Sequence, residues 1–214
     1  MTDITAAPTA KTVYVMRKQP RQRRARATVD AILEAAARIL VASGYASAST
    51  NRIAGRAGVG IGSLYEYFPG KEAIFAELRR REMARWYAKL RAGPVSGPPR
   101  DVIAHIVHTR IAFTSANPAL YAALETEVPR AAVAEMQGTI QDDFLSLSTA
   151  YLAAHRDLLR PKAPMSFVSE FLARWVNSTI HDFAMHAPAA LAGEHLADEL
   201  IDAVARYLLS TDEE

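Results

Sequence analysis

The spacing of apolar residues is the feature that most constrains the fold of this chain. Between residues 21 and 43, apolar side chains recur at intervals of three and four positions, namely Val29, Ile32, Leu33, Ala36, Ile39 and Leu40. This spacing places them on one face of a helix, which we expect to end at Gly44. Similar runs recur as far as residue 210, and no segment shows the alternation of a half-buried strand. The sequence therefore predicts an all-α fold.

Two short helices separated by a glycine turn are predicted between residues 49 and 68. Ser49 or Thr50 can cap the first helix, over residues 51–57, because a hydroxyl there accepts the free amide hydrogens of the first turn. The turn follows at Gly58, and the second helix spans residues 62–68. We expect these helices to share a small core of Ile53, Ala54, Val59, Leu64 and Phe68. This order is typical of a helix-turn-helix module, whose second helix enters the major groove of DNA.

Glycine and proline divide the rest of the chain. Residues 71–91 form one continuous helical pattern, and the segment from Gly93 to Pro99 then combines the two strongest helix breakers. With a domain boundary at this break, the sequence predicts four parts. These are a flexible arm over 1–20, a helix-turn-helix domain over 21–70, a connecting helix over 71–92 and a larger helical domain over 93–214. In the larger domain we expect helices over 101–115, 118–124, 129–155, 166–187 and 194–210, with Ser166 as the cap of the fourth.

Charge is divided unequally between the two parts. Residues 1–92 contain 17 Lys and Arg against 7 Asp and Glu, a net charge of +10, whereas the remaining residues contain 8 against 16, a net charge of −8. A basic part joined to an acidic one indicates that the first part meets a polyanion, of which nucleic acid is the leading candidate. The alternative is a solvated charge distribution without a partner.

Several functions are excluded or disfavoured by what the sequence lacks. The chain has no cysteine, which excludes disulfides, Cys-ligated zinc, iron–sulfur clusters and a thiol nucleophile. The glycine-rich stretch at Gly58 follows no strand, Gly70-Lys71 lacks the rest of a phosphate loop, and no nucleophile elbow is present. The sequence also shows no secretory signal and no long apolar run. We therefore expect a cytoplasmic protein that is not an enzyme and uses no cofactor.

One string of residues resembles a known family closely. It consists of Ser49-Thr50-Asn51-Arg52-Ile53-Ala54, Ala57-Gly58-Val59, Gly62-Ser63-Leu64-Tyr65-Glu66-Tyr67-Phe68 and Lys71-Glu72, and it resembles the tetracycline-repressor (TetR) family. The resemblance is dense over residues 25–75 and concerns only helical order and length beyond them. It implies a ligand-responsive DNA-binding regulator, a repressor, that binds a palindromic operator as a homodimer. A helical enzyme and an architectural DNA-binding protein without an effector are the alternatives.

The candidate DNA-binding residues come from both arguments. Gly62 would let the second helix lie close to DNA, Ser63 could donate to a phosphate or base, and Ile61 could meet a thymine methyl. The resemblance implies that Thr50 and Asn51, joined by Arg52, approach the backbone, and that Tyr65, Tyr67 and Lys71 hold phosphates. For the two tyrosines the alternative is a place in the core. Basic residues ahead of the first helix could enter a minor groove or be solvated, namely Arg21, Arg23, Arg24 and Arg26.

The resemblance makes the C-terminal part a domain for ligand binding and dimerisation. Candidate pocket residues are Trp86, Phe113, Tyr121, Met136, Phe144 and Trp175, although such residues at helical spacing are often plain core. We expect the homodimer to form through helices 166–187 and 194–210. The effector is a small molecule that the sequence does not identify. Two groups of histidines, His105 with His108 and His181 with His186, are interpreted as surface residues rather than as a metal site.

Overall fold

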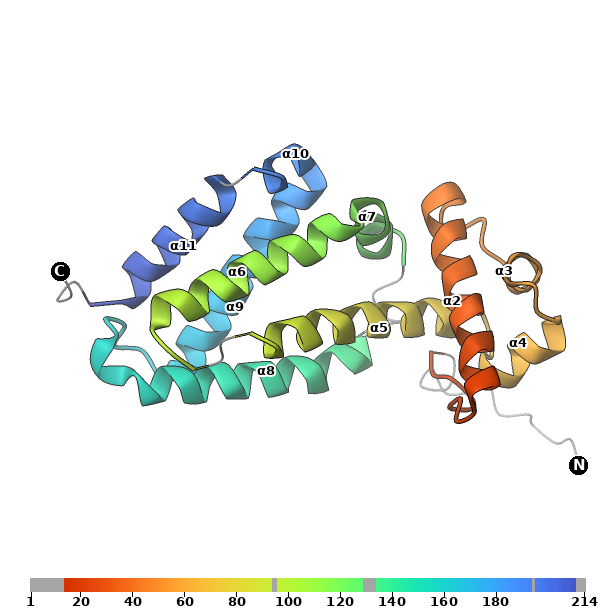
Figure 1. Ribbon diagram of the computed structural model, residues 1–214, viewed down its shortest axis with the longest axis horizontal. Helices are drawn as coiled ribbons and strands as arrows, with labels where there is room; N and C mark the ends of the chain where they lie inside the picture. Colours follow the sequence, from red (N-terminus) through yellow and green to blue (C-terminus); the bar gives the residue numbers. More distant parts are fainter. Residues whose placement is uncertain (1–13, 94–95, 129–133, 194, 211–214) are drawn as a thin grey trace, which may run out of the picture. The chain divides into compact units, whose positions relative to one another are not determined.

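The computed structural model describes residues 14–93, 96–128, 134–193 and 195–210, with the side chains of 134–141 left out (Figure 1). Within these residues all regular structure is helical apart from one isolated bridge between Leu159 and Leu209. The all-α prediction is confirmed. None of the helices in the described ranges has the length and hydropathy needed to cross a membrane.

The chain forms two compact units that interleave in sequence. Unit 1 comprises residues 1–82 and 119–136, and unit 2 comprises residues 83–118 and 137–214. Helix α5 (Lys71–Arg91) contributes its first part to unit 1 and its last part to unit 2. The units therefore divide the chain differently from the boundary predicted at Gly93, because residues 119–128 pack with the N-terminal part.

Unit 1 contains the two short helices and the helices that support them. Its members are α2 (Arg23–Ser43), α3 (Thr50–Ala57), α4 (Ile61–Tyr67), the start of α5 and most of α7 (Pro118–Thr126). Leu64 and Phe68 have no exposed surface and pack in one core with Ile32 and Phe75. The core predicted for the short helices therefore forms part of a larger one, to which α7 contributes Leu124.

The ends of these helices follow the local chemistry of the sequence. Gly44 ends α2 with φ of 76°, and Gly58 ends α3 in the left-handed region with φ of 66°, where a side chain would be strained. Ser49 caps α3, its side-chain oxygen accepting the amide hydrogen of Arg52 at 3.2 Å. The glycine turn and the hydroxyl cap are thus confirmed.

Residues 14–17 do not form part of a flexible arm. Met16 is 9% exposed and packs in the core of unit 1. The backbone amide of Arg17 donates to the carbonyl oxygen of Tyr67 at 2.8 Å. The guanidinium of Arg17 donates to the carbonyl oxygen of Tyr65 at 3.2 Å. These contacts hold the segment against the end of α4. The prediction of a flexible arm therefore stays a prediction for residues 1–13, which lie outside the described residues.

Unit 2 is a bundle of longer helices. It contains the end of α5, α6 (Pro99–Ala116), α8 (Ala134–Ala154), the 3-10 turn η2 (Arg156–Leu158), α9 (Met165–His186), α10 (Pro188–Leu191) and α11 (His195–Leu208). Helix α6 packs against both α9 and α11. Two details differ from the prediction. Helix α9 begins at Met165 with Pro164 at its cap position, so Ser166 is not the cap, and the short helix α10 opens at Pro188 where a loop was expected.

Candidate nucleic-acid interface and ligand cavity

One face of α4 is open to solvent. Ile61 is 39% exposed and Tyr65 is 40% exposed, although both are large and partly apolar. A Cβ atom added at Gly62 would meet nothing within 4 Å, and Asn51 at the start of α3 is exposed as well. The second helix of the module therefore presents a nearly bare backbone flanked by Ile61 and Tyr65, a surface that can approach base edges closely.

Hydrogen bonds fix the side chains around this face. The hydroxyl groups of Thr50 and Tyr65 lie 3.0 Å apart and join α3 to α4. The guanidinium of Arg52 donates to the carbonyl oxygen of Ser47 at 3.2 Å and to the hydroxyl of Ser43 at 2.9 Å. Arg52 thus holds the segment between α2 and α3 while its side chain remains exposed.

Lys71 and Tyr67 are less accessible than the residues of the open face. The ammonium of Lys71 donates to the carbonyl oxygen of Tyr45 at 3.1 Å and lies 4.3 Å from the centroid of the Tyr45 ring. Tyr67 is 7% exposed and packs in the core of unit 1. This is the alternative to phosphate binding that the sequence analysis gave for this tyrosine. Ser63 is half-buried. The predicted DNA-binding set therefore divides into an open face and a supporting group.

Burial perturbs one phenol beside this group. Burial, with the carboxylate of Glu72 as a smaller cause, raises the pKa of Tyr45 to about 12. The ring of Tyr45 also packs at 5.1 Å from that of Phe75. Tyr45 is therefore neutral at physiological pH and acts as the platform for Lys71.

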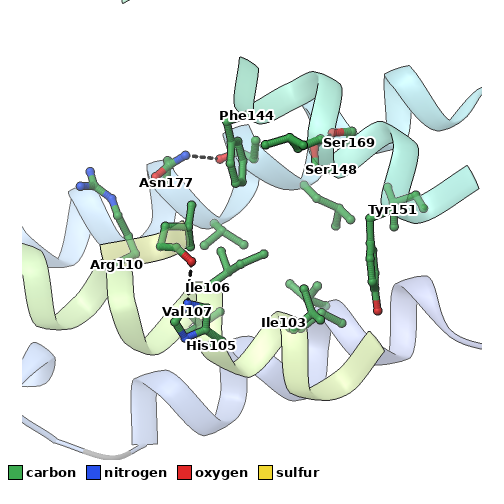
Figure 2. Close-up of a pocket in the computed structure, with 18 of the residues that line it drawn as sticks. Ile103, His105, Ile106, Val107, Arg110, Phe144, Ser148, Tyr151, Ser169 and Asn177 are labelled. Atoms are coloured by element: carbon green, nitrogen blue, oxygen red, sulfur yellow. Dashed lines mark hydrogen bonds between the residues drawn. The ribbon is translucent and has the colours of Figure 1, made fainter. Parts of the chain in front are cut away.

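Unit 2 encloses a cavity of about 330 Å³ (Figure 2). Its wall comes from α5, α6, α8, α9 and α11, and most of it is aliphatic or aromatic, including Leu90, Ile103, Val107, Leu152 and Val176. This volume lies in the range of sites for small molecules. The cavity is a candidate ligand site that lies wholly within one compact unit.

A few polar side chains interrupt the apolar wall. The guanidinium of Arg110 is packed over the Trp86 ring at 5.2 Å, and Arg110 is 9% exposed. His105 bonds through Nε2 to the carbonyl oxygen of Leu90 at 2.9 Å, and the Asn177 amide donates to that of Ala173 at 2.7 Å (Figure 2). These bonds fix the orientation of the polar groups within the wall.

Three further polar residues lie in the wall. The hydroxyl groups of Ser148 and Ser169 bond to each other, and that of Tyr151 donates to the carbonyl oxygen of Gly97 at 2.7 Å. Burial raises the pKa of Tyr87, and the charge of Arg110 opposes that rise. The cavity is therefore apolar with a small number of placed donors and acceptors.

The residues predicted for the pocket are distributed over three environments. Trp86 and Phe144 lie in the cavity wall, and Phe113 packs beside them. Tyr121 is on α7, which belongs mainly to unit 1, and is not in the wall. Trp175 is also outside the wall, because the cavity face of α9 is set by Ser169, Leu172, Ala173, Val176 and Asn177 at helical spacing. The side chain of Met136 lies outside the described residues.

None of the polar lining residues was predicted from the sequence to line a pocket. Arg110 carried a usable signal, since it lies at helical spacing from the apolar residues Ile103 and Val107 of α6 and is therefore a cation on a buried face. Ser148 and Ser169 carried none, because their meeting depends on how α8 packs against α9.

The histidines show no arrangement for a metal ion. His105 is half-buried in the cavity wall rather than on the surface, and His108 is exposed. His186 pairs with Asp182 on the same exposed face of α9 at 3.2 Å. Among the described residues, no group of three or more His, Asp or Glu side chains could hold a metal.

Fold and sites together define a helix-turn-helix protein with a separate cavity for a small molecule. Residues 32–78 match the family model for bacterial regulatory proteins of the TetR family, and residues 98–208 match that for tetracyclin repressor-like C-terminal domains. The chain belongs to the TetR family. It is a transcriptional regulator with a DNA-binding N-terminal module and a C-terminal ligand-binding domain. No curated protein sequence matches it.

Solved structures share the fold at low identity. NalD from Pseudomonas aeruginosa, the secondary repressor of the MexAB-OprM multidrug efflux pump, is 20% identical, with 88% of this chain and 98% of NalD covered and a TM-score of 0.70. SmeT of Stenotrophomonas maltophilia in complex with triclosan is 22% identical, with 87% and 93% covered and a TM-score of 0.67. The fatty acid degradation regulator FadR from Bacillus halodurans is 18% identical, with 92% and 99% covered and a TM-score of 0.67.

Proposed function

We propose that this regulator is a repressor that binds a palindromic operator as a homodimer in the bacterial cytoplasm and is released by a small molecule in the unit 2 cavity. The observation that carries the proposal is the apolar cavity of about 330 Å³ in the same chain as an open recognition helix. The names of NalD and SmeT, which are repressors of efflux pumps, and the SmeT complex with triclosan support it.

Helix α5 connects the two sites covalently. Ile74 and Phe75 of this helix are in the core of unit 1, and Trp86 and Leu90 are in the cavity wall of unit 2. A ligand that prefers one position of Trp86 and Leu90 therefore acts on a helix that also carries part of the DNA-binding core. A coupling free energy of about 1–3 kcal/mol would lower operator affinity roughly 5- to 150-fold.

An exposed aromatic patch supports dimerisation through α9 and α11. Phe167 and Phe171 are 58% and 40% exposed, and their rings stack with centroids 6.3 Å apart. The ring of Tyr207 on α11 packs 5.3 Å from that of Phe171. Clustered exposed aromatics mark interaction surfaces. Leu200 does not belong to this surface, because it is 5% exposed and packs in the core of unit 2.

Dimerisation is tested by the variant Phe171→Glu. We expect monomers by light scattering at micromolar concentration, because a charge would have to be buried against the second copy. The matched control is Val41→Glu, which introduces the same charge at an apolar residue of α2 that is 46% exposed. A Phe171→Glu protein that stays dimeric would place the interface elsewhere.

DNA recognition is tested by Gly62→Leu. A Cβ atom at position 62 meets nothing within 4 Å in the free protein, whereas in a complex the leucine side chain would stand between α4 and the bases. We expect unchanged thermal stability and roughly 5- to 150-fold weaker binding to an operator selected from genomic DNA, as one lost base contact of about 1–3 kcal/mol implies. Gly55→Leu on α3, whose Cβ would also meet nothing within 4 Å, is the control.

The effector function is tested by the melting temperature and by operator release. A bound molecule must raise the melting temperature of the chain, and the same molecule must weaken DNA binding in an anisotropy titration. A protein that prefers no genomic DNA over random duplex would refute the proposal. One that binds an operator but responds to no metabolite or drug would be an architectural protein instead.

A further inference from the structure

The cavity of unit 2 carries a positive charge inside an acidic region. Its described lining residues include Arg91, Arg110 and His105 but no Asp or Glu. The sequence from residue 93 onward nevertheless contains twice as many acidic as basic residues, 16 against 8. The sign of the lining charge is therefore opposite to that of the surrounding domain, which indicates a local role for it.

Arg110 is the lining cation that is withdrawn from solvent. Its residue is 9% exposed, whereas the side chain of Arg91 is 58% exposed and lies 3.8 Å from the carboxylate of Asp143. The Arg110 guanidinium is 5.2 Å from the centroid of the Trp86 ring and 6.0 Å from that of Phe113. Two aromatic faces thus hold a planar, permanently charged group whose fork of N–H donors matches a carboxylate.

Trp86 adds a second, independent donor at the same place. This residue is 4% exposed, and within the described part of the chain its indole Nε1 is a buried atom without a hydrogen-bond partner. Buried polar groups in native proteins are nearly always hydrogen-bonded, so an unpaired indole N–H on a residue of the cavity wall is a donor that an acceptor on a bound ligand can satisfy. In the view of Figure 2, Arg110 and Asn177 lie toward one end of the cavity and Tyr151 lies toward the other. Arg110 and the phenol of Tyr151 therefore lie toward opposite ends of the cavity.

We propose that the effector of this cavity is an amphipathic organic anion, whose acidic group binds to the Arg110 guanidinium and the Trp86 indole N–H and whose apolar body fills the remainder. This inference rests on the proposed function of the cavity as the effector site. An anionic group gains from a fixed cation because the apolar surroundings screen the attraction weakly. The aliphatic residues Ile103, Val107 and Leu152 then supply the surface for the apolar body.

A pair of fluorescent probes that differ only by one sulfonate group tests the proposal. The anion 1-anilinonaphthalene-8-sulfonate and the neutral N-phenyl-1-naphthylamine share the same aromatic body. We expect wild-type full-length protein to bind the anion more tightly. Arg110→Met should weaken the anion about tenfold or more and the neutral probe less than about threefold, because a charge-assisted bidentate contact is lost while the apolar surface stays. Arg174→Met, at an exposed arginine of α9 outside the wall, should change neither.

Three variants keep the test decisive. Val107→Trp fills the cavity and should abolish binding of both probes, which shows that the signal comes from this site. Trp86→Phe keeps a ring under Arg110 but removes the N–H, and should weaken the anion about three- to tenfold. Arg110→Lys keeps the charge without the fork, and should bind the anion with intermediate affinity. If Arg110→Met unfolds, the Trp86→Phe and Arg110→Lys affinities decide the question.

Competition identifies the acidic group and separates this inference from the proposed function. Displacement of the anionic probe by decanoate indicates a carboxylate and displacement by decyl phosphate indicates a phosphate, whereas equal displacement by 1-decanol would overturn the proposal. An unchanged ratio of the two probe affinities in Arg110→Met and Trp86→Phe would also overturn it. If only a neutral molecule releases operator DNA, the proposal of an anionic effector is refuted, but the proposed function as a ligand-responsive regulator stands. If anions bind through Arg110 but leave the affinity for operator DNA unchanged, the effector function is refuted, but the anion-binding site stands.

Discussion

Arg79 attaches α7 to the DNA-binding unit, and replacing it by Met should loosen that helix. The guanidinium of Arg79 donates to the carbonyl oxygen of Leu124 at 2.9 Å and pairs with Glu125 at 2.8 Å, with its side chain 11% exposed. The Leu124 carbonyl lies in the last turn of α7, where carbonyl groups have no partner within the helix. Met preserves the apolar stem of the side chain and removes both interactions.

The expected cost follows from the two contacts. A hydrogen bond from a charged donor contributes about 1.5–3 kcal/mol, and an ion pair to the quarter-exposed Glu125 adds up to about 1 kcal/mol. A loss of about 1.5–4 kcal/mol would raise the local opening equilibrium roughly 10- to 900-fold, since 1.36 kcal/mol corresponds to a factor of ten. The amide hydrogens of residues 119–126 should therefore exchange faster with deuterium by a similar factor, as mass spectrometry of the peptides would measure.

The matched control is Arg38→Met on α2 of the same unit. Arg38 pairs with Glu34, and both side chains are more than 60% exposed, so the variant should cost at most about 0.5 kcal/mol. Exchange of residues 119–126 should then stay within about twofold of wild type. If Arg79→Met left the protection of these residues unchanged, α7 would not be held by this contact and the reasoning would fail.

Three further outcomes are expected. Folding stability should fall as pH rises from 10 to about 12, because the folded chain keeps the proton of Tyr45 that the unfolded chain has lost, and Tyr45→Phe should remove that part of the slope in melting temperature against pH. Phe68→Ala should lower the free energy of unfolding by about 3–5 kcal/mol in urea titrations, since Phe68 has no exposed surface, and a loss below about 1 kcal/mol would contradict the packing. The double variant Ala84→Gly with Ala88→Gly, at exposed positions of α5, should weaken the effect of an effector on operator affinity, while the affinity for the effector stays nearly constant. Wild-type coupling in this variant would refute transmission through the helix.

The middle of α5 shows why such a test must avoid other positions of the helix. Glu77 is 6% exposed and accepts hydrogen bonds from Arg80 at 2.6 Å and Arg81 at 3.0 Å. Leu78 next to it is 5% exposed and packs in the core of unit 1. Glycine at these two positions would therefore destabilise the DNA-binding unit itself, whatever the helix transmits.

Local features of the fold were predictable from the sequence, and long-range packing was not. Gly44, Ser49 and Gly58 act through their own backbone or nearest amides, so the ends of α2 and α3 followed from residue type. The place of Leu120 in the core of unit 1 depends instead on how a distant segment packs. Leu200 illustrates the same limit, because its helical spacing fits a subunit interface and an internal core equally well.

The environment of a candidate site residue was predictable from the sequence where the backbone determines its accessibility. It was less predictable where it depends on contacts between side chains of different elements. An unobstructed Gly62 follows from glycine on a short exposed helix. The engagement of Arg52 by Ser43 and Ser47, and that of Lys71 by Tyr45, required the positions of other elements. Of the aromatic residues predicted for the pocket, Trp86 and Phe144 lie in the cavity wall and Trp175 does not, because residue type does not say which face of a helix meets which neighbour.

The contribution of α7 to unit 1 limits how far the DNA-binding part can be treated as an exchangeable module. Leu120, Leu124 and Val128 are 8%, 5% and 3% exposed in the core of that unit, although they follow the Gly93 to Pro99 break in the chain. A fragment ending at Gly93 would leave their partners uncovered, at about 1.5–3 kcal/mol for each missing side chain. Transferring this DNA-binding unit to another ligand-binding domain would therefore require residues 119–128 together with the N-terminal helices.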